Sequence, residues 1–70
     1  MGYHDMDLDD QVKAAIRRDG RLSKHRIGVS VKNGIVYLKG DLTAREHKRA
    51  LELIRNIESV AAVVDEMNQI

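Results

Sequence analysis

The sequence predicts an α+β fold, a two-layer αββαβ sandwich in which two helices pack on one face of a three-stranded mixed sheet. Three observations lead to this prediction: a stripe of apolar residues at helical spacing, a hairpin signal at an Asn-Gly pair, and a second amphipathic helix followed by a short alternating run. A strand–helix–strand crossover places the third strand parallel to the second, and such crossovers are right-handed. The two helices then cover one face of the sheet.

The first helix is predicted over residues 8–19. Its apolar residues recur at helical spacing and form one stripe, which comprises Leu8, Val12, Ala15 and Ile16. Asp7 is the expected N-cap, and Gly20 is the expected stop because glycine adopts the left-handed conformation readily. Residues 1–6 are expected to form a loose tail, and Leu22 is expected to enter the core.

The period then changes from 3.6 to 2 on both sides of Asn33-Gly34, a pair typical of a type I′ turn. A two-residue loop fixes the strand pairs as Val31 with Val36, Val29 with Leu38, Lys32 with Ile35, and Ser30 with Tyr37. The first two pairs make an apolar face, and the others make a mixed face that is expected to stay open. Gly40 is the expected end of the second strand.

A second helix is predicted over residues 44–58, with Thr43 as N-cap and a glutamate three residues later completing a capping box. A third strand is predicted over residues 62–68. Its alternation fits burial of either face, and we place Val63 and Met67 on the core face.

Seventy residues without cysteine limit the class of protein. Such a chain forms one domain and buries only about 60% of the surface exposed on unfolding. Neither disulfides nor a cysteine-ligated zinc ion can support it. No nucleophile elbow, phosphate-binding glycine loop or acid–base carboxylate pair is present. We therefore expect a binding module that is not an enzyme, with no catalytic residue and no cofactor.

The three histidines are dispersed over the predicted tail, connector and second helix, at positions 4, 25 and 47. No metal-ligand spacing and no acid–histidine pair supports a metal site. His47 is most simply a residue at the edge of the interior.

Charge is distributed unevenly along the chain. Residues 1–10 carry −4, residues 11–55 carry +8 and residues 56–70 carry −3. A basic middle favours an anionic partner, such as a phospholipid or membrane surface, and an ordinary surface of mixed charge is the alternative. The candidate lipid-binding residues are Lys13, Arg17, Arg18, Arg21, Lys24 and Arg26. Cations there also complement the C-terminal dipole of the first helix, which explains part of the cluster without any ligand.

A second candidate surface lies on the open face of the sheet and comprises Lys32, Ile35, Tyr37 and Lys39. It would contact another protein or domain, although single exposed apolar residues are also common on ordinary surfaces. Nucleic acid is the less favoured partner, because only two tyrosines are available to stack on bases.

Residues 29–40, read with their flanks, resemble the signature of the BON domain (bacterial OsmY and nodulation): an apolar strand, an Asn-Gly turn, a second strand and a closing glycine. The resemblance extends over residues 8–69 through Val12 and Ile16, the Ala50–Ile54 run, and Val60. One departure is Ser59, where the family usually has glycine.

The resemblance implies a single BON-like domain over residues 7–70, preceded by a flexible N-terminal tail over residues 1–6. It implies a non-catalytic role in binding phospholipid membranes or hydrophobic ligands, a periplasmic or cell-envelope setting, and a link to osmotic stress. A third possible role, sensing of a small cation, rests only on analogy with relatives in that family. No signal peptide or membrane span is visible in the sequence, which leaves a cytoplasmic location open.

Overall fold

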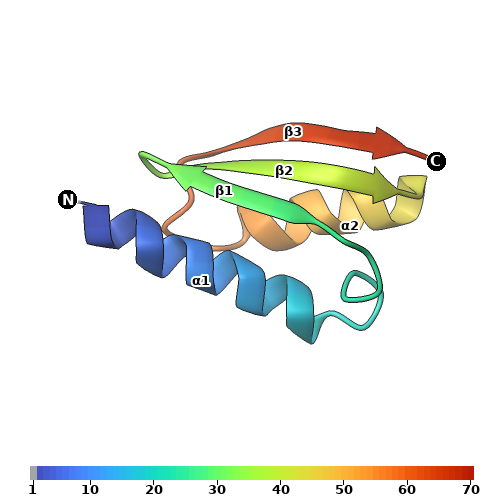
Figure 1. Cartoon of the computed structure of the whole chain (residues 1–70), viewed down its shortest axis with the longest axis horizontal. Coiled ribbons are helices and arrows are strands. Elements are labelled where there is room, and N and C mark those ends of the chain that lie inside the picture. Colours follow the sequence, from blue (N-terminus) through green and yellow to red (C-terminus); the bar gives the residue numbers. More distant parts are fainter. Residues whose placement is uncertain (1) are drawn as a thin grey trace.

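The computed structural model describes the backbone of residues 2–70 and the side chains of residues 7–70. Its elements follow the order α1 (Gly2–Arg18), β1 (Gly28–Lys32), β2 (Ile35–Leu42), α2 (Ala44–Arg55) and β3 (Ala62–Gln69). Both helices lie against the same face of a three-stranded sheet (Figure 1). The predicted αββαβ two-layer fold is confirmed.

The hairpin has the register that the alternation predicts. Val29 pairs with Leu38 and Val31 with Val36 in an antiparallel ladder. Asn33 has φ 53° and Gly34 has φ 78°, as a type I′ turn requires. The side chains facing the helices are therefore apolar on both strands, and the polar positions face outward.

The third strand runs parallel to β2, as the crossover through α2 demands. Val63 lies beside Val36 on the helix-covered face, and Met67 lies beside Gly40 on the same face. Met67 is buried and Val63 packs partly buried against the core. The predicted core face of β3 is thus confirmed.

The core lies between the helices and the sheet. Leu22 is fully buried although it belongs to the connector between α1 and β1, as its apolar side chain predicts. Seven side chains are completely enclosed and form the centre of this core, namely Val12, Leu22, Val36, Leu38, Leu42, Ala50 and Ile54.

The two ends of α1 differ from the sequence-based expectation. The helix begins at Gly2, so Asp7 lies within it and the prediction of a start near residue 8 with Asp7 as N-cap is wrong. The helix ends at Arg18, and Gly20 does not have a positive φ. The predicted left-handed glycine stop is therefore also wrong, because the carboxylate of Asp19 organises this turn instead.

The second helix begins as predicted. The Thr43 hydroxyl accepts a hydrogen bond from the Glu46 N–H at 3.3 Å, and the Glu46 carboxylate accepts one from the Thr43 N–H at 3.1 Å. The helix ends at Arg55, three residues before the predicted end, and Asn56 is its C-cap. The second strand continues two residues past Gly40, which is a point of close backbone approach and not the end of the strand.

Candidate functional site

The connector between α1 and β1 carries much of the basic cluster, and Asp19 holds it in place. The side chain of Asp19 is only 5% exposed. Its Oδ1 accepts hydrogen bonds from the N–H groups of Arg21, at 2.9 Å, and Leu22, at 3.3 Å. These bonds close a tight turn directly after the helix, so that Leu22 enters the core while Arg18 and Arg21 stay outside.

The other oxygen of Asp19 reaches the second helix. Oδ2 accepts a 2.5 Å hydrogen bond from Nε of Arg49, 30 residues away in sequence. Desolvation by itself would raise the pKa of the Asp19 carboxyl, but the bonds from Arg49 and from the backbone of Arg21 and Leu22 outweigh it, and the pKa falls below its usual value. Asp19 is therefore ionised at neutral pH and fastens the connector to α2.

A second contact fastens the far end of the connector. Nε2 of His25 lies 2.6 Å from Oε2 of Glu46, the glutamate of the capping box. The hydrogen bond with His25, followed by those with Thr43, lowers the pKa of the Glu46 carboxyl to about 2. The basic connector is thus pinned by carboxylates at both ends, and its cations project from a defined backbone.

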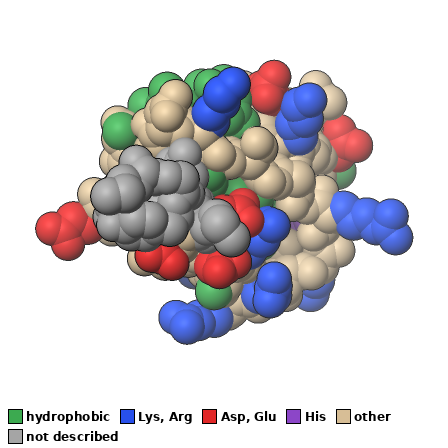
Figure 2. Space-filling view, turned by 60° about the vertical axis from the view of Figure 1, so that its left-hand side comes forward, with side chains coloured by type: hydrophobic (Ala, Val, Ile, Leu, Met, Phe, Trp, Pro, Cys, Tyr) green, Lys and Arg blue, Asp and Glu red, His purple; other side chains and the backbone are tan. Residues whose placement is uncertain are grey.

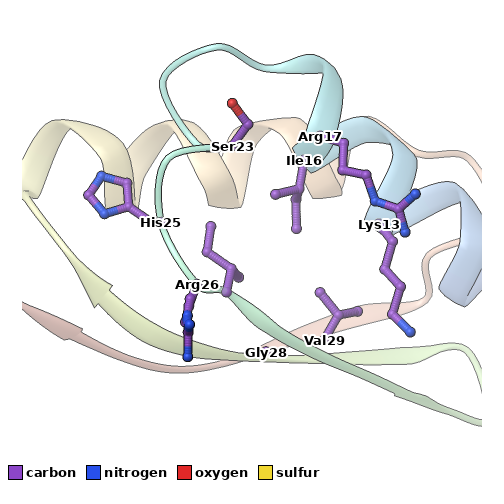
Figure 3. Close-up of a pocket in the computed structure, with 9 residues that line it drawn as sticks. Lys13, Ile16, Arg17, Ser23, His25, Arg26, Gly28 and Val29 are labelled. Atoms are coloured by element: carbon purple, nitrogen blue, oxygen red, sulfur yellow. The ribbon is translucent and has the colours of Figure 1, made fainter.

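A pocket of about 450 Å³ lies between α1, the connector and β1, and we call it the α1–β1 pocket. Ile16 and Val29 point toward one another across it, while Lys13 and Arg17 lie along its α1 side (Figure 3). Its complete lining is Lys13, Ile16, Arg17, Ser23, His25, Arg26, Ile27, Gly28 and Val29. The pocket combines apolar walls with a cationic rim, which is the arrangement that suits an anionic amphiphile.

The six predicted lipid-binding residues divide between two hollows. Lys13, Arg17 and Arg26 line the α1–β1 pocket. Arg18 and Arg21 line a different hollow, of about 580 Å³, that reaches α2. Lys24 is exposed and lines neither of these two.

Lys13 also has a partner on its own helix. Its Nζ lies 2.8 Å from Oδ2 of Asp9, one turn earlier. Pairs of this kind at the surface contribute at most about 1 kcal/mol. This bond therefore leaves Lys13 able to turn toward an anion at little cost.

The four residues of the predicted interaction face lie together on one face of the sheet. Lys32, Ile35, Tyr37 and Lys39 share the sheet face turned away from the helices, because each alternates with a core residue of its strand. Tyr37 and Lys39 line a small hollow of about 310 Å³ together with Ser30 and Glu66. Lys32 and Ile35 lie on the same face outside the lining of that hollow.

The sequence reading missed the contribution of β3 to this face. Val64 is 37% exposed and lies beside Tyr37 in the parallel register. The alternation of β3 contained this information, since Val64 must face outward once Val63 and Met67 face the core.

Charge is segregated along α1, with acids in its first half and bases in its last turn. In Figure 2, acidic side chains lie in the lower middle of the face shown and also at its left edge, top and right, while Lys and Arg side chains project from its lower edge, top and right-hand side. The cations therefore do not form one continuous patch on this face. Each of the two hollows is lined by cations from more than one element.

Two histidine–acid pairs exist that the sequence did not indicate. One is the pair of His25 and Glu46, and the other joins His47 of α2 to Asp65 of β3. Partial burial would raise the pKa of the Asp65 carboxyl, but bonds from the Met67 N–H and from His47 lower it. Nothing in sequence spacing shows these pairs, because each joins residues that only the fold brings together.

Within residues 7–70, no group of three or more His, Asp or Glu side chains is placed to hold a metal ion. In the part of the chain that the structure describes, neither helix combines the length and apolar character that a membrane crossing needs.

Comparison with known proteins agrees with the fold and the hairpin signature. No curated protein sequence matches the chain. The family model of the BON domain matches residues 4–70, which is nearly the whole chain and includes the hairpin, the closing Gly40 and both helices. The chain therefore belongs to the BON domain family.

Proposed function

We propose that this domain binds anionic phospholipid at a membrane surface through the α1–β1 pocket and the cations around it. BON domains are non-enzymatic binding modules associated with phospholipid, and proteins that carry them are typically periplasmic or envelope-associated. The observation that carries the proposal is the pocket itself, because Lys13 and Arg17 lie along the α1 side of walls made by Ile16 and Val29. Arg26 also lines the pocket, with its side chain pointing away from those two walls (Figure 3).

Two contributions to the binding free energy, electrostatic attraction and burial of apolar surface, act over different distances. Lys and Arg side chains near an anionic bilayer each contribute about 1 kcal/mol, and this attraction fades within a Debye length of about 8 Å at physiological salt. The apolar walls then accept part of an acyl chain or glycerol backbone, which depends far less on salt. Together they favour an anionic lipid over both a zwitterionic lipid and a free polyanion.

The rigid connector supports this arrangement. Arg26 lies between His25, which contacts Glu46, and Ile27, which packs against the core. Its backbone carbonyl also lies close to Gly40. Because its neighbours are fixed, the backbone of Arg26 needs little ordering when the side chain meets a headgroup.

The test is a flotation assay with vesicles of pure phosphatidylcholine and with vesicles containing phosphatidylglycerol, at low and raised salt. We expect binding only to the anionic vesicles and a marked loss at raised salt. The variant K13Q/R17Q/R26Q should lose this binding. The matched control K32Q/K39Q/R45Q removes the same charge from the open sheet face and α2 and should retain most of it.

Equal loss in both triple variants would show that net charge alone drives binding, and the assignment to the pocket would be wrong. Absence of binding to every anionic vesicle would remove the proposal as a whole.

A second candidate function is contact with another protein or domain through the open sheet face. The observation that favours it is the apolar strip formed by Ile35, Tyr37 and Val64 across two neighbouring strands. Docking there would change little with salt, and Tyr37→Ser would weaken it. The salt series above therefore separates the two candidates.

A further inference from the structure

A second hollow lies at the opposite side of the α1 terminus, where α1, the connector and α2 meet. Arg18 comes from the last turn of α1, Arg21 from the connector turn, and Arg49 from the middle of α2. We call this the arginine hollow. Its volume is about 580 Å³, and Ala15 and Leu53 give it an apolar floor.

The single acid in the lining pairs with Arg49 and leaves the charges of Arg18 and Arg21 unbalanced. Asp19 is buried, and both of its oxygens are engaged, one by the backbone of the connector turn and the other by Arg49. With three guanidinium groups and one carboxylate, the lining keeps a net charge of +2. Among the described side chains, neither Arg18 nor Arg21 takes part in an ion pair.

Asp19 also orients one of the arginines. Its bond to Arg49 uses the Nε–H group, and the Nη groups carry the four remaining N–H donors of that side chain. Holding Nε on a buried carboxylate restricts the plane of the guanidinium before any ligand arrives. A pre-oriented planar fork is the group that recognises phosphate oxygens in pairs.

We propose that the arginine hollow binds a phosphomonoester group, with Arg49 as the oriented donor and Arg18 and Arg21 as mobile cations that close on it. A phosphomonoester carries about −1.5 to −2 charges at pH 7, which matches the net charge of the lining better than a single carboxylate does. The floor of Ala15 and Leu53 accommodates the organic part of the ligand. The same chemistry is offered by a soluble phosphomonoester and by the headgroup of phosphatidic acid.

This inference deepens the proposed function by naming a headgroup class at a second place on the basic surface, yet it can fail independently. The α1–β1 pocket and the arginine hollow share no residue. If the arginine hollow does not bind phosphate, the expected binding to vesicles containing phosphatidylglycerol is therefore unchanged.

The first arm of the experiment titrates the ¹⁵N-labelled full chain with inorganic phosphate, replacing chloride at constant ionic strength. NMR follows the backbone amides and the arginine Nε–H signals. We expect saturable shifts at Arg18, Arg21 and Arg49. The variant R18Q/R21Q should raise the dissociation constant about tenfold, whereas R17Q/R26Q, which removes the same charge from the α1–β1 pocket, should leave it nearly unchanged.

Arg49→Ala would strip Asp19 of a partner and endanger the fold, so Arg49→Lys is the better substitution. It keeps the charge and a donor for Asp19 but removes the planar fork. We expect weaker phosphate binding with an unchanged circular dichroism spectrum and melting temperature. Shifts that never saturate, or that respond equally to R18Q/R21Q and R17Q/R26Q, would overturn the inference.

The second arm identifies the source of the phosphate group. Vesicles containing phosphatidic acid and vesicles containing phosphatidylglycerol are compared at matched surface charge. Tighter binding to phosphatidic acid that disappears in R18Q/R21Q assigns the hollow to a lipid headgroup. Equal binding to both vesicles, together with saturable phosphate binding, assigns it to a soluble phosphomonoester.

Discussion

Gly40 is a residue whose missing side chain the packing requires. Its φ is 151°, and a Cβ built there would lie 3.0 Å from the carbonyl oxygen of Arg26. We expect Gly40→Ala to lower the free energy of unfolding by about 1–3 kcal/mol, because it forces strain on β2 or displaces the connector. Urea denaturation measures this loss.

The matched control for that substitution is Gly20→Ala. Gly20 has no atom within 4 Å of a built Cβ and no positive φ. Alanine there restricts the unfolded chain and should be neutral or stabilising by up to about 1 kcal/mol. Equal losses at both glycines would contradict the argument from close approach.

Glu46 gives the domain an acid sensitivity with a defined sign. The pKa of its carboxyl is about 2 in the folded chain, below the ordinary 4.5, chiefly because of the hydrogen bond with His25. The group therefore stabilises the fold fully above pH 4.5, and this contribution is lost as the pH falls toward 2. The pKa values of Asp19 and Asp65 are shifted in the same direction.

We expect the melting temperature of the wild-type chain to fall steeply below pH 4.5 and that of Glu46→Gln to fall less steeply. The variant should be less stable than wild type at pH 7 and closer to it at pH 2.5. Calorimetric scans from pH 7 to 2 make the comparison. Parallel curves over the whole range would show that ionisation of Glu46 does not cause the acid sensitivity.

Sequence reasoning at the residue scale succeeded where the effect is local. Thr43, Asn33 and Gly34 act within three or four residues of themselves, so their roles could be predicted. Asp19 is the counterexample, because its bond to Arg49 spans 30 residues. The pattern of an aspartate followed by glycine after a helix does suggest an Asx turn, but it says nothing about which arginine completes the site.

At the scale of elements, the Thr43 hydroxyl supplies one half of the capping box that begins α2. Thr43 caps the helix and at the same time donates a 2.8 Å hydrogen bond to Oε1 of Glu46, whose other oxygen meets His25. We expect Thr43→Ala to lower the free energy of unfolding by about 1 kcal/mol. Thr43→Ser, which keeps the hydroxyl, should stay within a few tenths of wild type. Chemical denaturation of the three proteins tests this ordering.

The bounds of elements were predicted less well than their order. Hydrophobic period shows where a helix or strand must be, and it placed β1, β2 and the core face of β3 correctly. The hydrophobic period did not predict the early start of α1 at Gly2, because Gly2–Met6 offers neither an apolar stripe nor a capping signal. The candidate site was predicted only in part, since the charge along the sequence grouped six cations that the fold separates. Three of them line one hollow, two line another, and Lys24 lines neither.

At the scale of the whole molecule, the core is small and few residues can be spared from it. A domain of this size has about 3–5 kcal/mol of net stability from a single core. Leu38 is completely buried at the centre of β2, between Val29 on one neighbouring strand and Asp65 on the other. Removing such a leucine costs about 2–5 kcal/mol, which is most of the available stability.

We therefore expect Leu38→Ala to populate the unfolded chain substantially at 25 °C, with loss of dispersion in the ¹H–¹⁵N spectrum and loss of vesicle binding together. The matched control is Ile70→Ala, since Ile70 is 73% exposed while its backbone N–H still bonds to the Leu42 carbonyl. That variant should keep both the spectrum and the binding. Vesicle binding that survived in an unfolded Leu38→Ala chain would mean that the basic sequence suffices without the fold, and the pocket would then have no part in lipid recognition.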